Sequence, residues 1–145
     1  MTSIRKQAVA GGDVVTLKRG SIVEHFVTLT PEGDEAPRSL FRRAGEAVHA
    51  LGGQVISAEV LGMSPHDRQY IPDLAHAIDG GGLPIGWVEN SRAENLCGLY
   101  IWIASGMPIT RVHADGRVIG SLFEDDHARY CRLTGLLPTD TSHGR

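Results

Sequence analysis

Acidic and histidine side chains on short apolar runs are the first candidates for chemistry in this sequence. Glu89 lies near the end of the run PIGWVEN, which has the pattern of a strand. A carboxylate on a strand near a subunit edge can have its pKa raised by desolvation, which suits a general base. His25 alternates with valine and leucine in SIVEHFVTLT. We take Glu89 and His25 as candidate catalytic residues; the alternatives are an exposed strand charge and a partly buried structural histidine.

A site for a small metabolite also needs an anion-binding group and an apolar wall. Six further residues have suitable types: two arginines, three aromatic residues and one thiol. They are Arg92 and Arg129, Trp87, Tyr100 and Tyr130, and Cys97. Each also has an ordinary interpretation as a solvated arginine, an aromatic residue in the core or a subunit contact, or a small apolar cysteine.

The acidic stretch at 124–127 (EDDH) does not predict a metal site. Its residues are consecutive, adjacent side chains point apart, and no distant ligand completes a coordination sphere. The stretch DGGG at 79–82 lacks the Gly-Lys-Ser/Thr that follows in a phosphate-binding loop, so it predicts a flexible turn. We therefore expect no metal and no cofactor.

Residues 39–62 predict the unit that positions these side chains. Apolar residues recur at helical spacing, with Ser39 as N-cap and Gly52 as the stop, which predicts an amphipathic helix. From residue 54 the period changes to two, which predicts a strand over 54–61. Ile56, Ala58 and Val60 are expected on one face of this strand, and Ser57 and Glu59 on the other.

Two pairs of strands flank this unit. Residues 13–18 and 21–30 predict a β-hairpin through Arg19-Gly20, preceded by a loose arm over 1–12. A short second helix is expected over 70–78, and 84–90 with 96–105 are expected to form a second antiparallel pair.

The stretch 96–105 is apolar on both faces, so it predicts a strand that is covered from both sides. One or two helices cover only one face of a sheet. A partner subunit is therefore expected on the other face. The tail contains a further hairpin candidate over 110–123 and is expected to cap a sheet edge; the alternative is a lid that brings Arg129 or Tyr130 to a cleft.

Composition bounds the possible functions. The 145 residues fit one domain, and a net charge of −3 gives no general attraction to nucleic acid or an anionic membrane. No apolar run approaches the ~20 residues that span a bilayer, and the N-terminal stretch has no signal-peptide core. The two cysteines are far apart in sequence and are expected as reduced thiols. We expect a cytoplasmic protein.

The order of these elements resembles the RidA/YjgF superfamily over roughly residues 13–105. The helix that ends in ALGG before the strand at 54–61, and the paired strands that begin with Pro84, carry the resemblance. It implies an α+β, chorismate-mutase-like sandwich, with an antiparallel-rich mixed sheet and two helices on one face. It also implies a homotrimer with a central barrel and ligand clefts between subunits. Residues 1–145 then form one domain, with 106–145 as a C-terminal extension.

The chain departs from the family at two positions. RidA-type deaminases carry Pro-x-Arg at the start of the penultimate strand, and this arginine grips the substrate carboxylate. Here Pro84-Ile85-Gly86 has glycine instead. The family's glutamate, near the water that attacks the imine, aligns near Leu99. Standard 2-imino-acid deamination therefore stays an alternative.

The resulting expectation is a trimer that binds a small metabolite between subunits. As an enzyme, it would carry out a hydrolase or lyase reaction on an imine, enamine or enol-ether substrate. The other possibility is a non-catalytic ligand-binding or assembly protein. We expect neither nucleic acid nor membrane as a partner.

Overall fold

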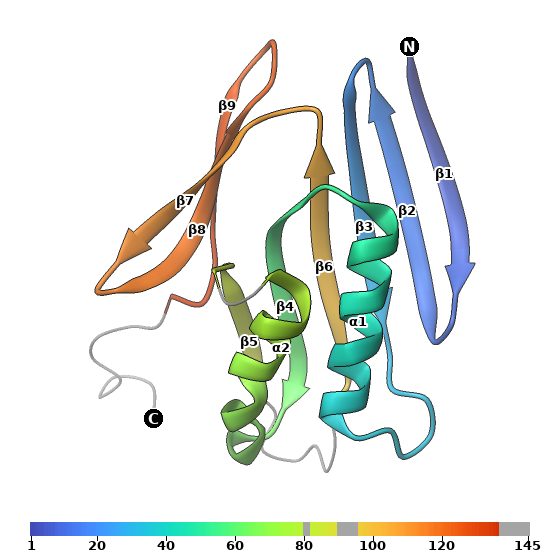
Figure 1. The fold of residues 1–145 in the computed structure, drawn as a ribbon, viewed down its shortest axis with the longest axis vertical. Coiled ribbons are helices and arrows are strands. Elements are labelled where there is room, and N and C mark those ends of the chain that lie inside the picture. The colour runs from blue at the N-terminus through green and yellow to red at the C-terminus, as the bar shows by residue number, and fades with distance from the viewer. Residues whose placement is uncertain (80–81, 90–95, 137–145) are drawn as a thin grey trace.

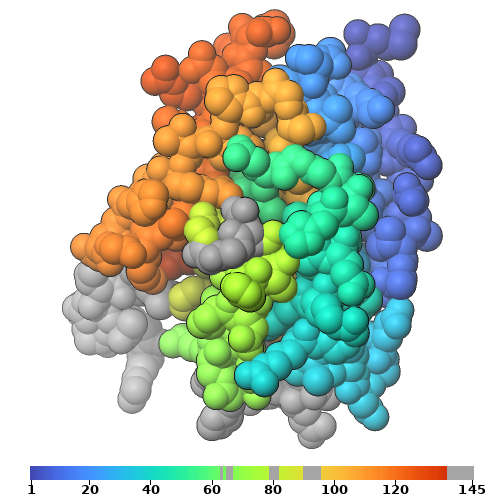
Figure 2. Space-filling model, viewed as in Figure 1, coloured from blue at the N-terminus to red at the C-terminus, as the bar shows by residue number. Residues whose placement is uncertain are grey.

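The described part of the chain forms two β-sheets and two α-helices. The computed structural model describes residues 1–79, 82–89 and 96–136. Its six-stranded main sheet has the order β1-β2-β3-β6-β4-β5, and a separate C-terminal sheet has the order β7-β8-β9 (Figure 1). Both α-helices lie on one face of the main sheet, called here the helix face; the opposite face is the outer face. The space-filling view shows the two helices side by side across the helix face (Figure 2).

The elements follow one another along the chain with short connections. The main sheet contains β1 (Thr2–Val9), β2 (Gly12–Arg19), β3 (Ile22–Leu29), β4 (Gln54–Met63), β5 (Ile85–Glu89) and β6 (Gly98–Ser105). The C-terminal sheet contains β7 (Ile109–Ala114), β8 (Arg117–Glu124) and β9 (Arg129–Leu133). The helices are α1 (Pro37–Leu51), the 3-10 helix η1 (Pro65–Tyr70) and α2 (Ile71–Asp79). Among the described residues, no helix is both long and apolar enough to cross a membrane.

The N-terminal strands form an antiparallel meander. The predicted hairpin is confirmed as β2 and β3, which pair from Gly12 with Leu29 to Arg19 with Ile22. The predicted loose arm is wrong, because β1 pairs with β2 along its whole length. Backbone hydrogen bonds to the open edge of β2 order this segment, although its side chains are almost all exposed.

The main helix is present but begins earlier than predicted. Ala36 is the N-cap residue and makes no side-chain cap hydrogen bond, while a proline occupies the first turn. Ser39 lies inside the first turn, where its hydroxyl donates to Glu35 Oε1 at 3.2 Å, so its predicted capping role is wrong. Gly52 ends the helix as predicted, with a φ of 72°. The predicted second helix is confirmed as α2, which η1 precedes.

The predicted pairing of the strands at 84–90 and 96–105 is wrong. β6 lies in the middle of the sheet and pairs with β3 and β4, both antiparallel. β5 pairs with β4 instead, and in parallel. The reason is topological: η1 and α2 carry the chain back across the helix face, and such a crossover returns the next strand parallel to the previous one.

A β-bulge at Ile56 changes the predicted faces of β4. Val55 pairs with Ile103 and Ser57 pairs with Trp102, so Ile56 is the extra residue. Val55, with Ala58 and Val60 further along the strand, belongs to the core under the helices. Ile56 instead packs with Ala104 and Phe123 on the outer face. The prediction that Ile56 shares a face with Ala58 and Val60 is therefore wrong.

β6 is apolar on both faces, as predicted. Leu99, Ile101 and Ile103 are fully buried on the helix face, whereas Tyr100 and Trp102 are half-buried on the outer face. The C-terminal sheet of the same chain covers part of the outer face through Phe123. The rings of Phe123 and Trp102 contact each other edge-on, with their centres 5.4 Å apart. The tail thus covers a face and pairs with neither edge of the main sheet, which corrects the edge-cap expectation. The expectation that a partner subunit covers the outer face is therefore wrong for the part that this chain's own C-terminal sheet covers.

Candidate functional site

Ionisable side chains gather where the outer face meets the C-terminal sheet. Alternate residues of β3, β4 and β6 point to this face, and among them are Glu24, Glu59 and Tyr100. Asp125, in the turn between β8 and β9, and Arg132 of β9 come from the C-terminal sheet. These groups form two clusters, each of which includes an ion pair between the two sheets.

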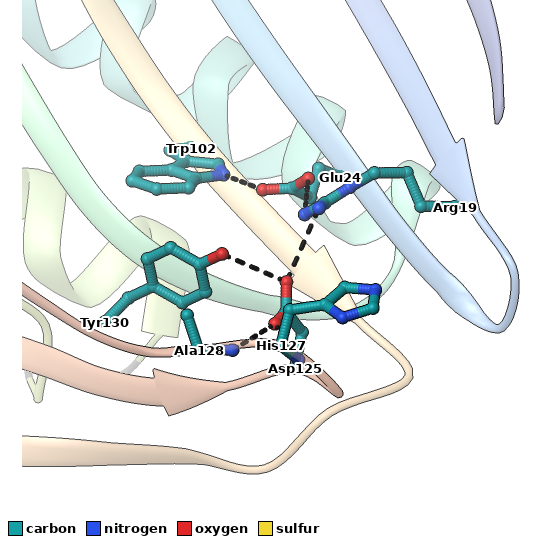
Figure 3. Close-up of polar contacts among 7 residues, drawn as sticks. All are labelled: Arg19, Glu24, Trp102, Asp125, His127, Ala128 and Tyr130. Atoms are coloured by element: carbon teal, nitrogen blue, oxygen red, sulfur yellow. Dashed lines mark hydrogen bonds and ion pairs between the residues drawn. The ribbon is translucent and has the colours of Figure 1, made fainter.

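The first cluster, here called the Arg19 cluster, consists of Arg19, Glu24, Trp102, Asp125 and Tyr130 (Figure 3). Arg19 Nη2 donates to Glu24 Oε2 at 3.0 Å, and Arg19 Nη1 donates to Asp125 Oδ2 at 3.4 Å. The indole of Trp102 donates to Glu24 Oε1 at 3.2 Å, and the Tyr130 hydroxyl donates to Asp125 Oδ2 at 3.1 Å. Glu24 is only 4% exposed, so both of its oxygens are engaged inside the protein.

The charges of the Arg19 cluster compensate one another. Hydrogen bonds from the backbone N–H groups of His127 and Ala128 lower the pKa of Asp125, with smaller contributions from Tyr130 and Arg19. The hydrogen bond to Glu24 raises the pKa of Arg19. Hollows of about 350 and 410 Å³ open beside this cluster. Both carboxylates and both Nη groups of Arg19 are paired, while Arg19 Nε is buried without a partner among the described residues. These ion pairs fasten the two sheets together.

The second cluster, here called the Tyr100 cluster, consists of Tyr100, Glu59 and Arg132. Tyr100 and Glu59 are direct cross-strand partners on β6 and β4, and Gly86 of β5 is the next partner in the same row. Arg132 of β9 donates from Nη2 to Glu59 Oε1 at 2.5 Å. The side chains of this pair are 42% and 27% exposed.

The Tyr100 cluster has unused hydrogen-bonding capacity. Burial raises the pKa of Tyr100, Arg132 lowers it, and Glu59 and Glu24 raise it further. Because this pKa lies above the ordinary value of 10, the Tyr100 hydroxyl is neutral at pH 7 and can donate a hydrogen bond. It makes no side-chain hydrogen bond with any residue that the structure describes. Arg132 Nε is buried without a hydrogen-bond partner among the described residues. The cluster therefore combines a donor, a carboxylate and a cation, the set of groups that an acid/base site for a small polar molecule requires.

Glu89 and Trp87 lie elsewhere, on the edge strand β5. Trp87 packs against the core of the helix face, and the guanidinium of Arg68 lies 5.5 Å from the centre of its ring. Arg68 also forms an ion pair with Glu89. The two predicted residues are thus brought together around Arg68, on the far side of the sheet from the Tyr100 cluster.

His25 and Cys97 lie in two further places. His25 Nδ1 and Thr16 Oγ1 are 2.8 Å apart, and burial, followed by the charge of Lys18, lowers the pKa of His25. Cys97 is exposed just before β6, against Gly62. The predicted Arg92 lies outside the described residues.

Tyr130 and Arg129 lie on β9. Tyr130 stacks on Phe123 with ring centres 5.2 Å apart and belongs to the Arg19 cluster. Arg129 forms an ion pair with Glu124 at 3.1 Å, inside the C-terminal sheet. The predicted catalytic and binding residues therefore do not converge on one place.

Neither Glu59 nor Arg132 is among the site residues predicted from the sequence. The alternation within 54–61 does place Glu59 on the face opposite Ala58 and Val60, which is a usable signal. No local pattern predicts a role for Arg132 in a site, because its partner Glu59 is 73 residues away in sequence. Only the packing of the two sheets brings it to Glu59.

The main sheet, mostly antiparallel with two helices on one face, is an α+β fold that fits the RidA-type architecture expected from the resemblance. The crystal structure of a "putative translation initiation inhibitor" from Salmonella typhimurium is similar, with a TM-score of 0.51 and 13% sequence identity. The similarity covers 71% of this chain and 98% of that chain. At this identity the likeness shows the fold. No protein-family model matches the chain, and no curated protein matches it.

The two positions at which the chain departs from the RidA deaminases lie on different faces. Gly86 lies in the outer-face row next to Glu59. Leu99, which aligned with the family glutamate, is fully buried in the core of the helix face. Its outward neighbour on β6 is Tyr100, and the nearest carboxylate in that row is Glu59 on the adjacent strand.

Proposed function

We propose that this chain is a RidA-like protein that binds a small metabolite at the Tyr100 cluster, on the outer face of the main sheet. The observation that carries the proposal is the half-exposed Arg132–Glu59 pair beside a tyrosine hydroxyl that has no hydrogen bond among the described residues. A guanidinium with a buried, unused Nε favours an anionic ligand, and a carboxylate is the most suitable group.

The same groups support a hydrolase or lyase reaction on an imine, enamine or enol-ether substrate. Glu59 would move the proton, Tyr100 would donate a hydrogen bond to the atom on which charge develops, and Arg132 would hold the substrate anion. Standard deamination of 2-imino acids is the weaker alternative, because Gly86 supplies no guanidinium from β5. Binding without turnover would identify a non-catalytic ligand-binding protein.

We also propose that the chain assembles as a homotrimer through the part of the outer face that its own C-terminal sheet leaves open. That part includes Ile4, which is 74% exposed, and the half-buried Val15, Leu17 and Phe26. Sedimentation analysis at micromolar concentration tests this assembly, and a clean monomer would contradict it. A cytoplasmic location stays a prediction.

The experiment that tests the ligand site uses 2-oxobutyrate, the stable oxo analogue of 2-iminobutyrate, as the probe. We expect calorimetry to show binding that Arg132→Ala and Tyr100→Phe each weaken about tenfold, as expected for the loss of one hydrogen bond to a charged group. Arg117→Ala, at an exposed arginine of the same small sheet, is the matched control and should leave binding unchanged.

A turnover assay complements the binding experiment. With 2-iminobutyrate generated in place, we expect little acceleration of hydrolysis. Rapid turnover that survives Arg132→Ala and Glu59→Gln would contradict the proposed site.

A further inference from the structure

We propose that residues 132–135 form a strap that lifts to admit the ligand and closes to bring Arg132 to it, and that Gly86 is the notch in which this strap is seated. The ligand in this statement rests on the proposed function. The seating of the strap rests on contacts within the chain.

The notch is formed by the absence of a side chain at Gly86. A Cβ at this buried position would lie 2.2 Å from Thr134 Oγ1 and 3.6 Å from Glu59 Cγ. Real Cβ atoms do not approach other heavy atoms as closely as 2.2 Å, so Thr134 occupies the space that any side chain on Gly86 would need. Gly86 thus allows the strap to lie directly on β5, beside the carboxylate that binds Arg132.

A second glycine completes the seat from the side of the strap. Gly135 has a φ of 68°, and a Cβ there would lie 2.5 Å from the carbonyl oxygen of Ile85. Both the backbone conformation and the close approach require glycine at this position. Two glycines that face each other across the contact therefore fit the strap to one place on the main sheet.

Arg132 and Leu133 are the last two residues of β9, where they pair with Ser121 and Gly120 of β8, so lifting the strap frays the end of an edge strand. Two further contacts hold the strap. The Thr134 N–H donates to the carbonyl oxygen of Ile119 at 2.9 Å, and Arg132 pairs with Glu59. Within the described residues, neither apolar cluster includes any member of the strap. Lifting the strap therefore exposes no apolar core, and such segments have low local stability.

The strap also carries the only arginine of the Tyr100 cluster. In the closed position Arg132 Nη2 is bound to Glu59, while its Nε is buried and finds no hydrogen-bond partner in the part of the chain that the structure describes. A ligand anion placed beside Tyr100 would satisfy the remaining donors. The strap would then bind more firmly when the ligand is present, so that binding and closure stabilise each other.

The test compares Gly86→Ala with Gly82→Ala, a matched control at a glycine whose added Cβ would meet nothing within 4 Å. Amide hydrogen exchange at 132–135 reports the strap without any ligand, and calorimetry with 2-oxobutyrate reports the site. We expect Gly86→Ala to accelerate exchange at 132–135 at least tenfold and to weaken probe binding at least tenfold. Gly82→Ala should change neither.

A double variant and a volume-neutral variant keep the test decisive. Gly86→Ala combined with Thr134→Ala removes the clashing Oγ1 and should restore slow exchange and binding. If Gly86→Ala does not fold, Arg132→Gln releases the pair without adding volume and should give the same two effects.

The outcomes separate the inference from the proposed function. Unchanged exchange in Gly86→Ala would overturn the notch, and faster exchange with unchanged probe affinity would overturn the role of the strap in binding. If the wild type does not bind the probe but the exchange results hold, the proposed ligand fails and the seated strap stands. Slower exchange at 132–135 in the wild type on addition of the probe supports both.

Discussion

The two faces of the main sheet are built on different principles. On the helix face, Leu99, Ile101 and Ile103 are fully enclosed beneath α1 and α2 by side chains that belong to the same core. On the outer face, Tyr100 and Trp102 of the same strand are half-buried among charged groups and covered in part by a small second sheet. One face therefore supplies the apolar core, while the other presents the polar groups of the two clusters.

The largest effect is expected from a charge placed on the helix face. Leu99→Asp would bury a carboxylate without a partner in a fully enclosed position, and we expect it to cost at least about 4 kcal/mol and to prevent stable folding. Val88→Asp, at a 57% exposed position of β5, is the control and should cost little. Urea denaturation measures both, and wild-type stability in Leu99→Asp would show that the two faces do not differ as described.

A second large effect is expected where α1 is fastened to the sheet. Arg43 binds both carboxylate oxygens of Glu35 and the carbonyl oxygens of Ala10 and Thr30. Arg43→Met should lower the free energy of unfolding at pH 7 by about 2–4 kcal/mol, because it leaves these groups unpaired. The exposed pair formed by Arg42 gives the control, and Arg42→Met should cost less than about 0.5 kcal/mol.

This contribution depends on pH in a defined direction. The hydrogen bond from Arg43 lowers the pKa of Glu35 from 4.5 to about 2. A depressed carboxylate pKa stabilises the folded state above the unfolded pKa and loses that effect as the pH falls toward the folded pKa. The difference between wild type and Arg43→Met should therefore be complete at pH 7 and shrink from about pH 4.5 toward pH 2. A difference that is constant across this range would contradict the assignment.

A smaller and more local effect is expected on the outer face. Phe123 is 6% exposed and contacts both Trp102 and Tyr130. Phe123→Ala should cost about 3 kcal/mol, but mainly by detaching the C-terminal sheet. We expect faster hydrogen exchange in β7–β9 with β6 still protected. Leu133→Ala, at a 43% exposed position, is the control, and simultaneous loss of protection in both sheets would show that they form one cooperative unit.

The smallest effect concerns His25, a titratable group on the helix face opposite Ile103. Burial lowers its pKa, so the folded state disfavours protonation, and stability is lost as the pH falls below the unfolded value near 6.5. His25→Gln should remove this part of the pH dependence, by less than about 1 kcal/mol between pH 7 and 5. Thermal melting curves at these two values measure it, and an identical pH dependence in His25→Gln would exclude the assignment.

Local patterns predicted the helix face well and the outer face poorly. The helical spacing within 39–51, the alternation of β2 and β3, and the two apolar faces of β6 all came from side chains close in sequence. The parallel placement of β5 depends on the crossover through α2. β1 is ordered by hydrogen bonds to the open edge of β2, and the side-chain pattern of residues 2–9 does not predict that pairing. The Arg132–Glu59 pair depends on how two sheets pack, which no periodicity encodes.

The β-bulge at Ile56 determines whether the outer face offers an apolar side chain to the C-terminal sheet. Removing this one residue would realign β4 with β6 and turn a serine, in place of isoleucine, toward Phe123. The main sheet would keep its helices but would lose the isoleucine side chain that packs against Phe123 of the C-terminal sheet. One extra residue in β4 thus supplies an apolar side chain against which a second sheet packs.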